Sequence, residues 1–146
     1  MEIIIALIFS ISVEFGLPPY FVLAVATVES ELYVQAVGTN YHADGSISYD
    51  LGLMQLNSNN YGTEWDWQDP ETNIRKGCEH IINEILVHQD VNTWWRVAVA
   101  YNCGYGNLFR DGGPPKQSVK YADKVINKWD DLTNGRSEIY INGRGL

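Results

Sequence analysis

A nearly continuous apolar segment lies early in the chain. Residues 21–28 are apolar on every face except at Thr27, which is typical of a helix that is buried on all sides. Pro18 and Pro19 favour a helix start, because proline already has the helical φ and lacks the N–H that a first turn leaves unbonded. The pattern therefore predicts a buried helix that carries Glu29 at its far end.

Helical periodicity recurs in four other segments. Gly16 and Gly104 mark the ends of two of them, and Asp69-Pro70-Glu71 supplies an N-cap, a proline at N1 and an acid in the first turn. Thr93 can cap another helix start. The four predicted helices are residues 2–15, a segment from Asp69–Pro70 through His88, residues 94–103, and a segment that begins at Ser118.

One β element is expected between the helices. Asp44-Gly45 is a hairpin turn signal, and Ser46–Asp50 alternates in polarity beside it. Residues 34–41, 59–68 and 105–116 are predicted as loops, because they are rich in Gly, Asn, Pro or polar residues.

These elements together predict a mainly α fold of the α+β class, with one small β-hairpin inserted after the buried helix. The length of 146 residues is typical of one domain with a single sizeable core. We expect a single domain over residues 1–146, with its core at about 15–130 and a tail at 133–146 that contains a strand-like run, Ile139–Ile141.

Composition narrows the choice of partners. The formal net charge of −8 disfavours nucleic acid and anionic membranes, which need a basic surface. The five Trp and nine Tyr can fill the core or stack on sugars. Cys78 and Cys103 can pair in an oxidising compartment or act as small hydrophobes, and neither has metal-ligand spacing.

The apolar run from Ile3 to Ile11 resembles a signal peptide only in part. Glu2 stands where a basic residue is expected, no small-residue cleavage pattern follows, and the run is too short to span a bilayer. We interpret it as a first core helix and predict no transmembrane segment.

Candidate chemistry centres on Glu29. Partial burial and the negative end of the helix dipole both disfavour the carboxylate, so the pKa of Glu29 is expected to be raised, as a general acid requires. The alternative is a solvated helix end. Phosphate-loop, dinucleotide-binding, H-E-x-x-H and G-x-S-x-G motifs are absent from the sequence, and we predict no metal and no cofactor.

The polar residues Asp50, Gln55 and Asn57 follow the hairpin, and Tyr101 and Asn102 lie at the end of another buried helix. Each has an ordinary structural explanation by itself, as a turn, cap or core residue. Together with a raised-pKa acid they supply what sugar chemistry needs, namely amides for hydroxyl groups and a second carboxylate.

Three ordered motifs make a resemblance specific. Glu29-Ser30, Gly52-Leu53-Met54-Gln55 and Ala100-Tyr101-Asn102-Cys103-Gly104 together resemble the signature of the soluble lytic transglycosylase catalytic domain, a lysozyme-like fold that acts on peptidoglycan. Asn73-Ile74 with Gly77 and the closing Tyr121-x-x-x-Val125 are similar to further segments of that family. The resemblance covers about residues 15–130, and Cys103 departs from the more usual alanine.

The resemblance implies a role for each matched residue. Glu29 would be the catalytic acid and base that cleaves the bond between N-acetylmuramic acid and N-acetylglucosamine with a 1,6-anhydro product. Tyr101 would orient Glu29. Ser30 could steady the Glu29 segment instead of binding substrate, and Asn102 could instead hold the end of its helix. The expected substrate-binding residues are Ser30, Met54, Gln55, Asn57, Tyr101, Asn102 and Tyr121.

Asp50 leaves the reaction open. The run from Asp50 to Ser58 is also similar to the hairpin of c-type lysozymes and of type IV secretion system transglycosylases. A well-placed second carboxylate would make the chain a muramidase that uses Glu29 with Asp50, whereas a locally bonded Asp50 would be structural. A glycan-binding module without turnover is the non-enzymatic alternative.

The expected partner is the peptidoglycan glycan strand. The resemblance implies action at the cell wall, whether periplasmic, extracellular or phage-delivered. A secretion-system enzyme, a phage lysin or virion component, and a piece of a longer exported protein all fit the sequence, and we expect a monomer.

Overall fold

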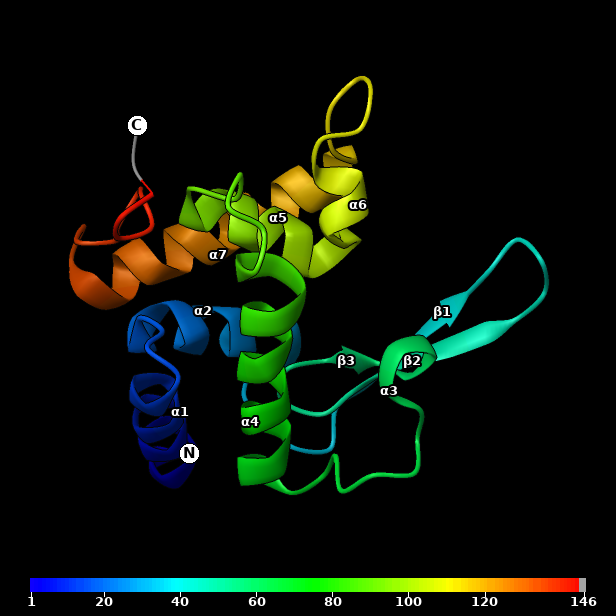
Figure 1. Cartoon of the computed structure of the whole chain (residues 1–146). Coiled ribbons are helices and arrows are strands. Elements are labelled where there is room, and N and C mark those ends of the chain that lie inside the picture. Colours follow the sequence, from blue (N-terminus) through cyan, green and yellow to red (C-terminus); the bar gives the residue numbers. More distant parts are fainter. Residues whose placement is uncertain (145–146) are drawn as a thin grey trace. The chain divides into compact units, whose positions relative to one another are not determined.

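The computed structural model describes residues 1–144 of the chain. These residues form two compact units, Met1–Cys78 and a second unit that begins at Glu79. Helices dominate, and a small antiparallel sheet follows the second helix (Figure 1). The predicted α+β class with lysozyme-like character is therefore confirmed. The expectation of a single domain over 1–146 stays a prediction.

The first unit begins with two helices that pack on each other (Figure 1). Helix α1 spans Glu2–Glu14, and Gly16 follows it with φ +68°, a left-handed conformation that glycine adopts without strain. Helix α2 spans Pro19–Ser30, and the side chains of residues 21–26 are buried. Both predicted helices are confirmed, and the all-round burial of α2 follows from its apolar sequence.

The sheet has three strands in the order β1-β2-β3: Val37–Tyr41, Ile47–Leu51 and Leu56–Asn57. Strands β1 and β2 form a hairpin, with Asn40 opposite Ser48, and its turn lies at the predicted Asp44-Gly45. The prediction of a loop over 34–41 was wrong for residues 37–41. Gly38 and Asn40 weaken the strand signal of β1, and pairing with β2 supplies the backbone hydrogen bonds that the segment needs.

Helix α3 spans Ser58–Tyr61, so the prediction of a loop over 59–68 was wrong for residues 59–61. Helix α4 spans Pro70–His80, and Asp69 caps it as predicted, since its carboxylate accepts hydrogen bonds from the amide and hydroxyl of Thr72. The helix continues without a break into η1, Ile81–Leu86, whose π-helical winding the sequence pattern did not indicate.

The second unit is built on two long helices that pack along each other (Figure 1). Helix α5 spans Trp94–Cys103, begins at the predicted Thr93 cap and ends before Gly104. Helix α6, Tyr105–Leu108, occupies part of the segment predicted as a loop. Helix α7 spans Lys116–Thr133 and so begins two residues before the predicted Ser118.

The tail folds back onto the start of α5. The amide of Trp94 donates to the carbonyl of Ile139, the amide of Ile141 donates to the carbonyl of Asn92, and Thr93 pairs with Tyr140. The strand-like run at 139–141 is therefore a single bridge rather than a strand of the sheet. None of the helices formed by residues 1–144 combines the length and the apolar character that crossing a membrane requires.

Candidate active site

The end of α2 places Glu29. Glu29 is half-buried and lies one position before the end of the helix, and Ser30 beside it is buried. Glu31 then adopts a left-handed conformation with φ +52°, and its amide donates to the carbonyl of Thr27. The chain therefore leaves the helix directly after Glu29-Ser30, which puts Glu29 at the edge of a buried apolar element.

A hydrogen bond joins the first motif to the second. The hydroxyl of Ser30 lies 2.8 Å from the carbonyl oxygen of Leu53 and 3.0 Å from that of Ala26 in its own helix. Leu53 belongs to the Gly52-Leu53-Met54-Gln55 motif, 23 positions further along the chain. Ser30 thus fixes the end of α2 against that motif, which fits the expected steadying role.

Asn73 on α4 holds the same motif from the other side. Its Oδ1 accepts a hydrogen bond from the amide of Met54 at 2.8 Å, and its Nδ2 donates to the carbonyls of Leu51 and Trp67, both at 3.0 Å. A Cβ at Gly52 would lie 2.1 Å from Asn73 Nδ2, so only glycine fits there. The Asn73 side chain therefore fills the space that the missing side chain of Gly52 leaves.

Met54, expected from the resemblance to be a substrate-binding residue, is fully buried. Its side chain lies against Gly77 of α4, where an added Cβ would come within 2.7 Å of Met54 Cγ. In this structure Met54 therefore sets the packing between the motif and α4. Contact of Met54 with substrate stays a prediction.

Asp50 is held by two amide side chains. Its Oδ2 accepts from Asn40 Nδ2 at 2.9 Å, and its Oδ1 accepts from Asn57 Nδ2 at 2.8 Å. Asn57 also donates to the hydroxyl of the buried Ser48, which in turn lies 2.8 Å from His42 Nε2. These side chains connect all three strands, since Asn40 is on β1, Ser48 and Asp50 on β2, and Asn57 on β3.

Gln55 has a constrained backbone and an engaged side chain. Its φ is +51°, which is uncommon outside glycine, and its Nε2 donates to the carbonyls of Ala36 and Gly52. The side-chain amide of Gln55 therefore braces the base of the hairpin, and contact of Gln55 with substrate stays a prediction.

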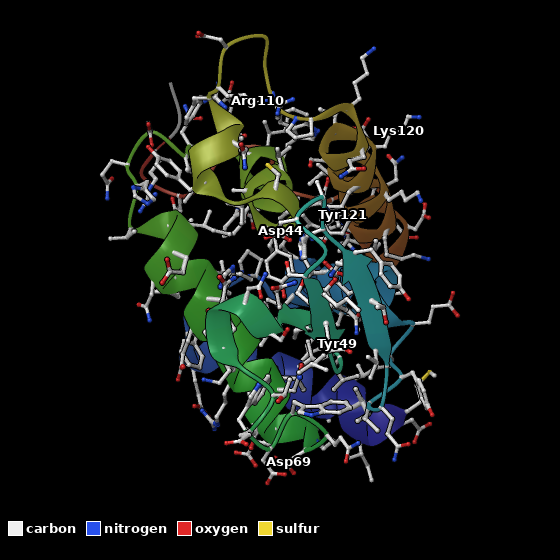
Figure 2. The ribbon with its side chains drawn as sticks, turned by 90° about the vertical axis from the view of Figure 1, so that its right-hand side faces the viewer. Asp44, Tyr49, Asp69, Arg110, Lys120 and Tyr121 are labelled. Carbon is white, nitrogen blue, oxygen red and sulfur yellow. The ribbon has the colours of Figure 1, made fainter. Side chains whose placement is uncertain are left out.

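The remaining predicted residues lie in the second unit. Tyr101 and Asn102 are in the last turn of α5, and Tyr121, labelled in Figure 2, is half-buried on α7. The ring of Tyr101 packs edge-on against His80 with centroids 5.6 Å apart, and burial lowers the pKa of His80. Asn102 Oδ1 accepts from the hydroxyl of Ser118 at 2.7 Å, which ties the end of α5 to the start of α7.

Cys103 follows Asn102 and is a free cysteine in the structure. Burial raises the pKa of its thiol, so it favours the protonated form at neutral pH. Among residues 1–144, no group of three or more His, Cys, Asp or Glu side chains is arranged to hold a metal ion.

Sequence reasoning did not identify Asn40 and Ser48, which complete the hydrogen bonds around Asp50 and Asn57. Asn40 lay in a segment predicted as a loop, so its place opposite Ser48 was not visible. The available signal was alternation, because residues two apart on a strand share one face. The pairs 38 and 40, and 48 and 50, form such a face once β1 is recognised as a strand.

The structure therefore has a lysozyme-like α+β fold, in which a small sheet follows the buried helix that ends at Glu29-Ser30. The chain belongs to the family of transglycosylase SLT domains, which matches residues 6–124. A search of curated proteins finds no match. Membership of this family supports a glycan-cleaving role of the lytic transglycosylase or lysozyme type, with peptidoglycan as the substrate.

Proposed function

We propose that the chain is a lytic transglycosylase that cleaves the β-1,4 bond between N-acetylmuramic acid and N-acetylglucosamine, with Glu29 as its acid and base. Family membership supports the glycan-cleaving class and the peptidoglycan substrate. The observation that carries the assignment of Glu29 is the Ser30–Leu53 hydrogen bond, because it fixes the acid-bearing helix end to the second signature motif.

The proposed reaction needs one carboxyl group and no water. Protonated Glu29 gives its proton to the glycosidic oxygen while the bond from that oxygen to C1 of the muramic residue breaks. The Glu29 carboxylate then takes the proton of the muramic 6-hydroxyl as its oxygen bonds to C1. The 1,6-anhydro ring closes, and Glu29 is protonated again for the next turnover.

Half-burial of Glu29 favours this use. A carboxyl group at the edge of an apolar helix is partly shielded from water, which disfavours its charged form relative to an exposed glutamate. The raised pKa expected from the sequence stays part of the proposal. Gln55, Asn57, Tyr101, Asn102 and Tyr121 are proposed as sugar contacts on the strength of the family motifs they match.

A muramidase is the second candidate, and the geometry around Asp50 favours it. Two amide donors, Asn40 and Asn57, orient both carboxylate oxygens of Asp50. A carboxylate fixed in this way could stabilise the oxocarbenium-like centre or bond to it, after which water would complete hydrolysis. The same contacts also suit a purely structural residue that joins three strands, so the products must decide.

Digestion of purified peptidoglycan separates these functions by mass spectrometry. A transglycosylase releases 1,6-anhydro products, which are one water lighter than the reducing ends that a muramidase releases. Glu29→Gln should lower turnover by about 10²–10⁴-fold, the usual contribution of a general acid. Asp50→Asn should leave turnover within about tenfold for the transglycosylase and lower it much further for the muramidase.

Three outcomes would contradict the proposal. Reducing ends as the main product would replace the transglycosylase by the muramidase. Wall cleavage that survives Glu29→Gln would remove Glu29 from the chemistry in both, and binding without any cleavage by the native chain would leave a glycan-binding module.

A further inference from the structure

The β1–β2 hairpin has its polar and apolar faces reversed relative to a common antiparallel sheet. Such sheets usually bury their apolar face and expose their polar one. Here Ser48 is completely buried, and Asn40 and Asp50 beside it are half-buried and hydrogen-bonded. The residues that alternate with them point the other way and are exposed, except Leu51 at the end of β2, which is buried opposite Val37.

We call this other side the outer tyrosine face. Its members share one side of the hairpin, because Thr39 is opposite Tyr49 and Tyr41 is opposite Ile47 in the strand register. Tyr41 is 81% exposed and Tyr49 38% exposed. The face consists of Val37, Thr39, Tyr41, Ile47 and Tyr49. In Figure 2, Asp44 marks the turn of the hairpin, and Tyr49 lies further along the strand that leaves it.

We propose that the outer tyrosine face is a second glycan-binding surface, which holds a peptidoglycan strand outside the proposed catalytic site. This inference takes peptidoglycan as the ligand from the proposed function. It adds a binding surface that the proposed chemistry at Glu29 does not require. Tyr49 and Asp50 are neighbours on β2, and their side chains leave opposite faces of that β-strand. A glycan bound to the outer tyrosine face therefore does not occupy the side on which Asp50 lies.

The chemistry of the face fits sugar rings. Tyrosine combines a flat apolar ring with a hydroxyl, and a sugar combines apolar ring faces with hydroxyls at its edge. Tyr41, Tyr49 and Thr39 supply two rings and three hydroxyls, and Val37 and Ile47 supply apolar contact beside them. Residues 37–41 extend over about 13 Å at the usual rise of a strand, which is long enough for more than one sugar ring.

Charge and area disfavour other occupants. The five side chains of the face are uncharged in a chain with net charge −8, so the face has no complement for an acidic or basic partner. Its four larger side chains expose less than the roughly 800 Å² that each partner buries in a stable protein interface, which disfavours a second copy of the chain.

The test measures binding of the Glu29→Gln chain to insoluble peptidoglycan by co-sedimentation, so that the glycan is not consumed. Adding Tyr41→Thr and Tyr49→Thr should weaken binding by about tenfold, whereas Tyr41→Phe and Tyr49→Phe should bind nearly as the parent does, because the rings remain. Threonine preserves strand propensity. Tyr33→Thr is the matched control, since Tyr33 is 59% exposed and lies outside the sheet.

Turnover completes the test in the chain that retains Glu29. The threonine double variant should cleave short soluble glycan fragments at the native rate and insoluble peptidoglycan more slowly. Unchanged binding, or an equal loss for Tyr33→Thr, would overturn the second surface while leaving Glu29 untouched. A native chain that sediments as a dimer and a double variant that does not would assign the face to self-association instead.

Discussion

Ser30 acts through the backbone of a distant segment. Its side chain is buried, and its hydroxyl donates to the Leu53 carbonyl, 23 positions further along the chain. This hydrogen bond joins the end of α2 to the second motif, and contact of Ser30 with substrate stays a prediction. The neighbouring motif residues Gly52 and Met54 are likewise engaged with Asn73 and Gly77.

Ser30→Ala should lower the free energy of unfolding by about 1–2 kcal/mol, because the Leu53 carbonyl loses a donor inside the protein. Urea unfolding measures the change. Ser12→Ala is the control: Ser12 is also buried, but its hydroxyl donates to the Ile8 carbonyl four residues back in its own helix. That substitution should be close to neutral, and equal losses at both positions would contradict the special role of Ser30.

Helix α4 is the element that organises the second motif. Asn73 and Gly77 are four residues apart and so lie on one face of the helix. Asn73 bonds the backbone on both sides of Leu53, and Gly77 gives the Met54 side chain room to pack. The hydrogen bonds of Asn73 and the absence of a side chain at Gly77 thus both fix the second motif against α4.

Gly77→Ala should destabilise the chain by about 1–3 kcal/mol, since the added methyl group would lie 2.7–2.9 Å from three atoms of Met54 and force them to shift. Gly106→Ala on α6 is the matched control, because no atom lies within 4 Å of a Cβ there, and it should be neutral or stabilise by about 0.5 kcal/mol. Thermal unfolding compares the two. A neutral Gly77→Ala would mean that Met54 moves aside easily.

A salt bridge links α1 to α4 at the surface. Arg75 donates to both carboxylate oxygens of Glu14, at 2.7 and 3.1 Å, and to Glu71 at 3.1 Å. The hydrogen bond with Arg75 is the main cause that lowers the pKa of Glu14 in the folded chain. A lowered folded-state pKa adds stability above the unfolded-state pKa, and this stability is lost as the pH falls through the folded-state pKa.

Glu14→Gln should therefore reduce the melting temperature slightly at pH 7, and the difference from the native chain should shrink below about pH 4.5 as Glu14 becomes protonated. Melting curves from pH 7 to about pH 3 measure it. Glu64→Gln, at an exposed glutamate in the 62–69 segment, is the control and should leave this pH dependence unchanged. A difference that grows on acidification would contradict the assignment.

At the scale of the whole molecule, the family match ends at residue 124, and the tail beyond it makes hydrogen bonds of its own to the second unit. The two Asn-Gly-Arg sequences in the tail do different things. Arg136 bonds the nearby Thr133 carbonyl, whereas Arg144 donates to the carbonyls of Leu86, His88 and Val91, more than 50 positions back. Arg144 thus caps the end of η1 with a charge that suits a helix C-terminus.

Arg144→Met should lower the free energy of unfolding by about 2 kcal/mol, because the carbonyl of Leu86 at the end of η1 and those of His88 and Val91 just after it lose a charged donor. Arg136→Met removes the same charge from the same tripeptide and should cost less than about 1 kcal/mol, since its bond is local. Denaturant unfolding of both variants provides the comparison. Equal costs would show that net charge, rather than the cap, determines the effect.

Much of the helical framework could be predicted because its signals are local. Asp69-Pro70, Thr93 and Gly104 act through hydrogen bonds and φ angles within a few residues, and the helix ends lie at or near the predicted positions. Strand β1 and helix α6 were missed, because Gly38, Asn40 and the glycines near α6 weaken local signals. Strand β1 also depends on pairing with a partner across a turn.

The sequence by itself determined the apolar helix that ends at Glu29, the position of the hairpin turn and the ordered motifs of the family, since each depends on neighbours in the chain. Only the tertiary structure decided that Ser30 bonds Leu53, that Asn73 and Gly77 enclose the second motif, and that Asn40 and Asn57 hold Asp50. These contacts join residues 7 to 23 positions apart, and their geometry exists only after helices and strands have packed.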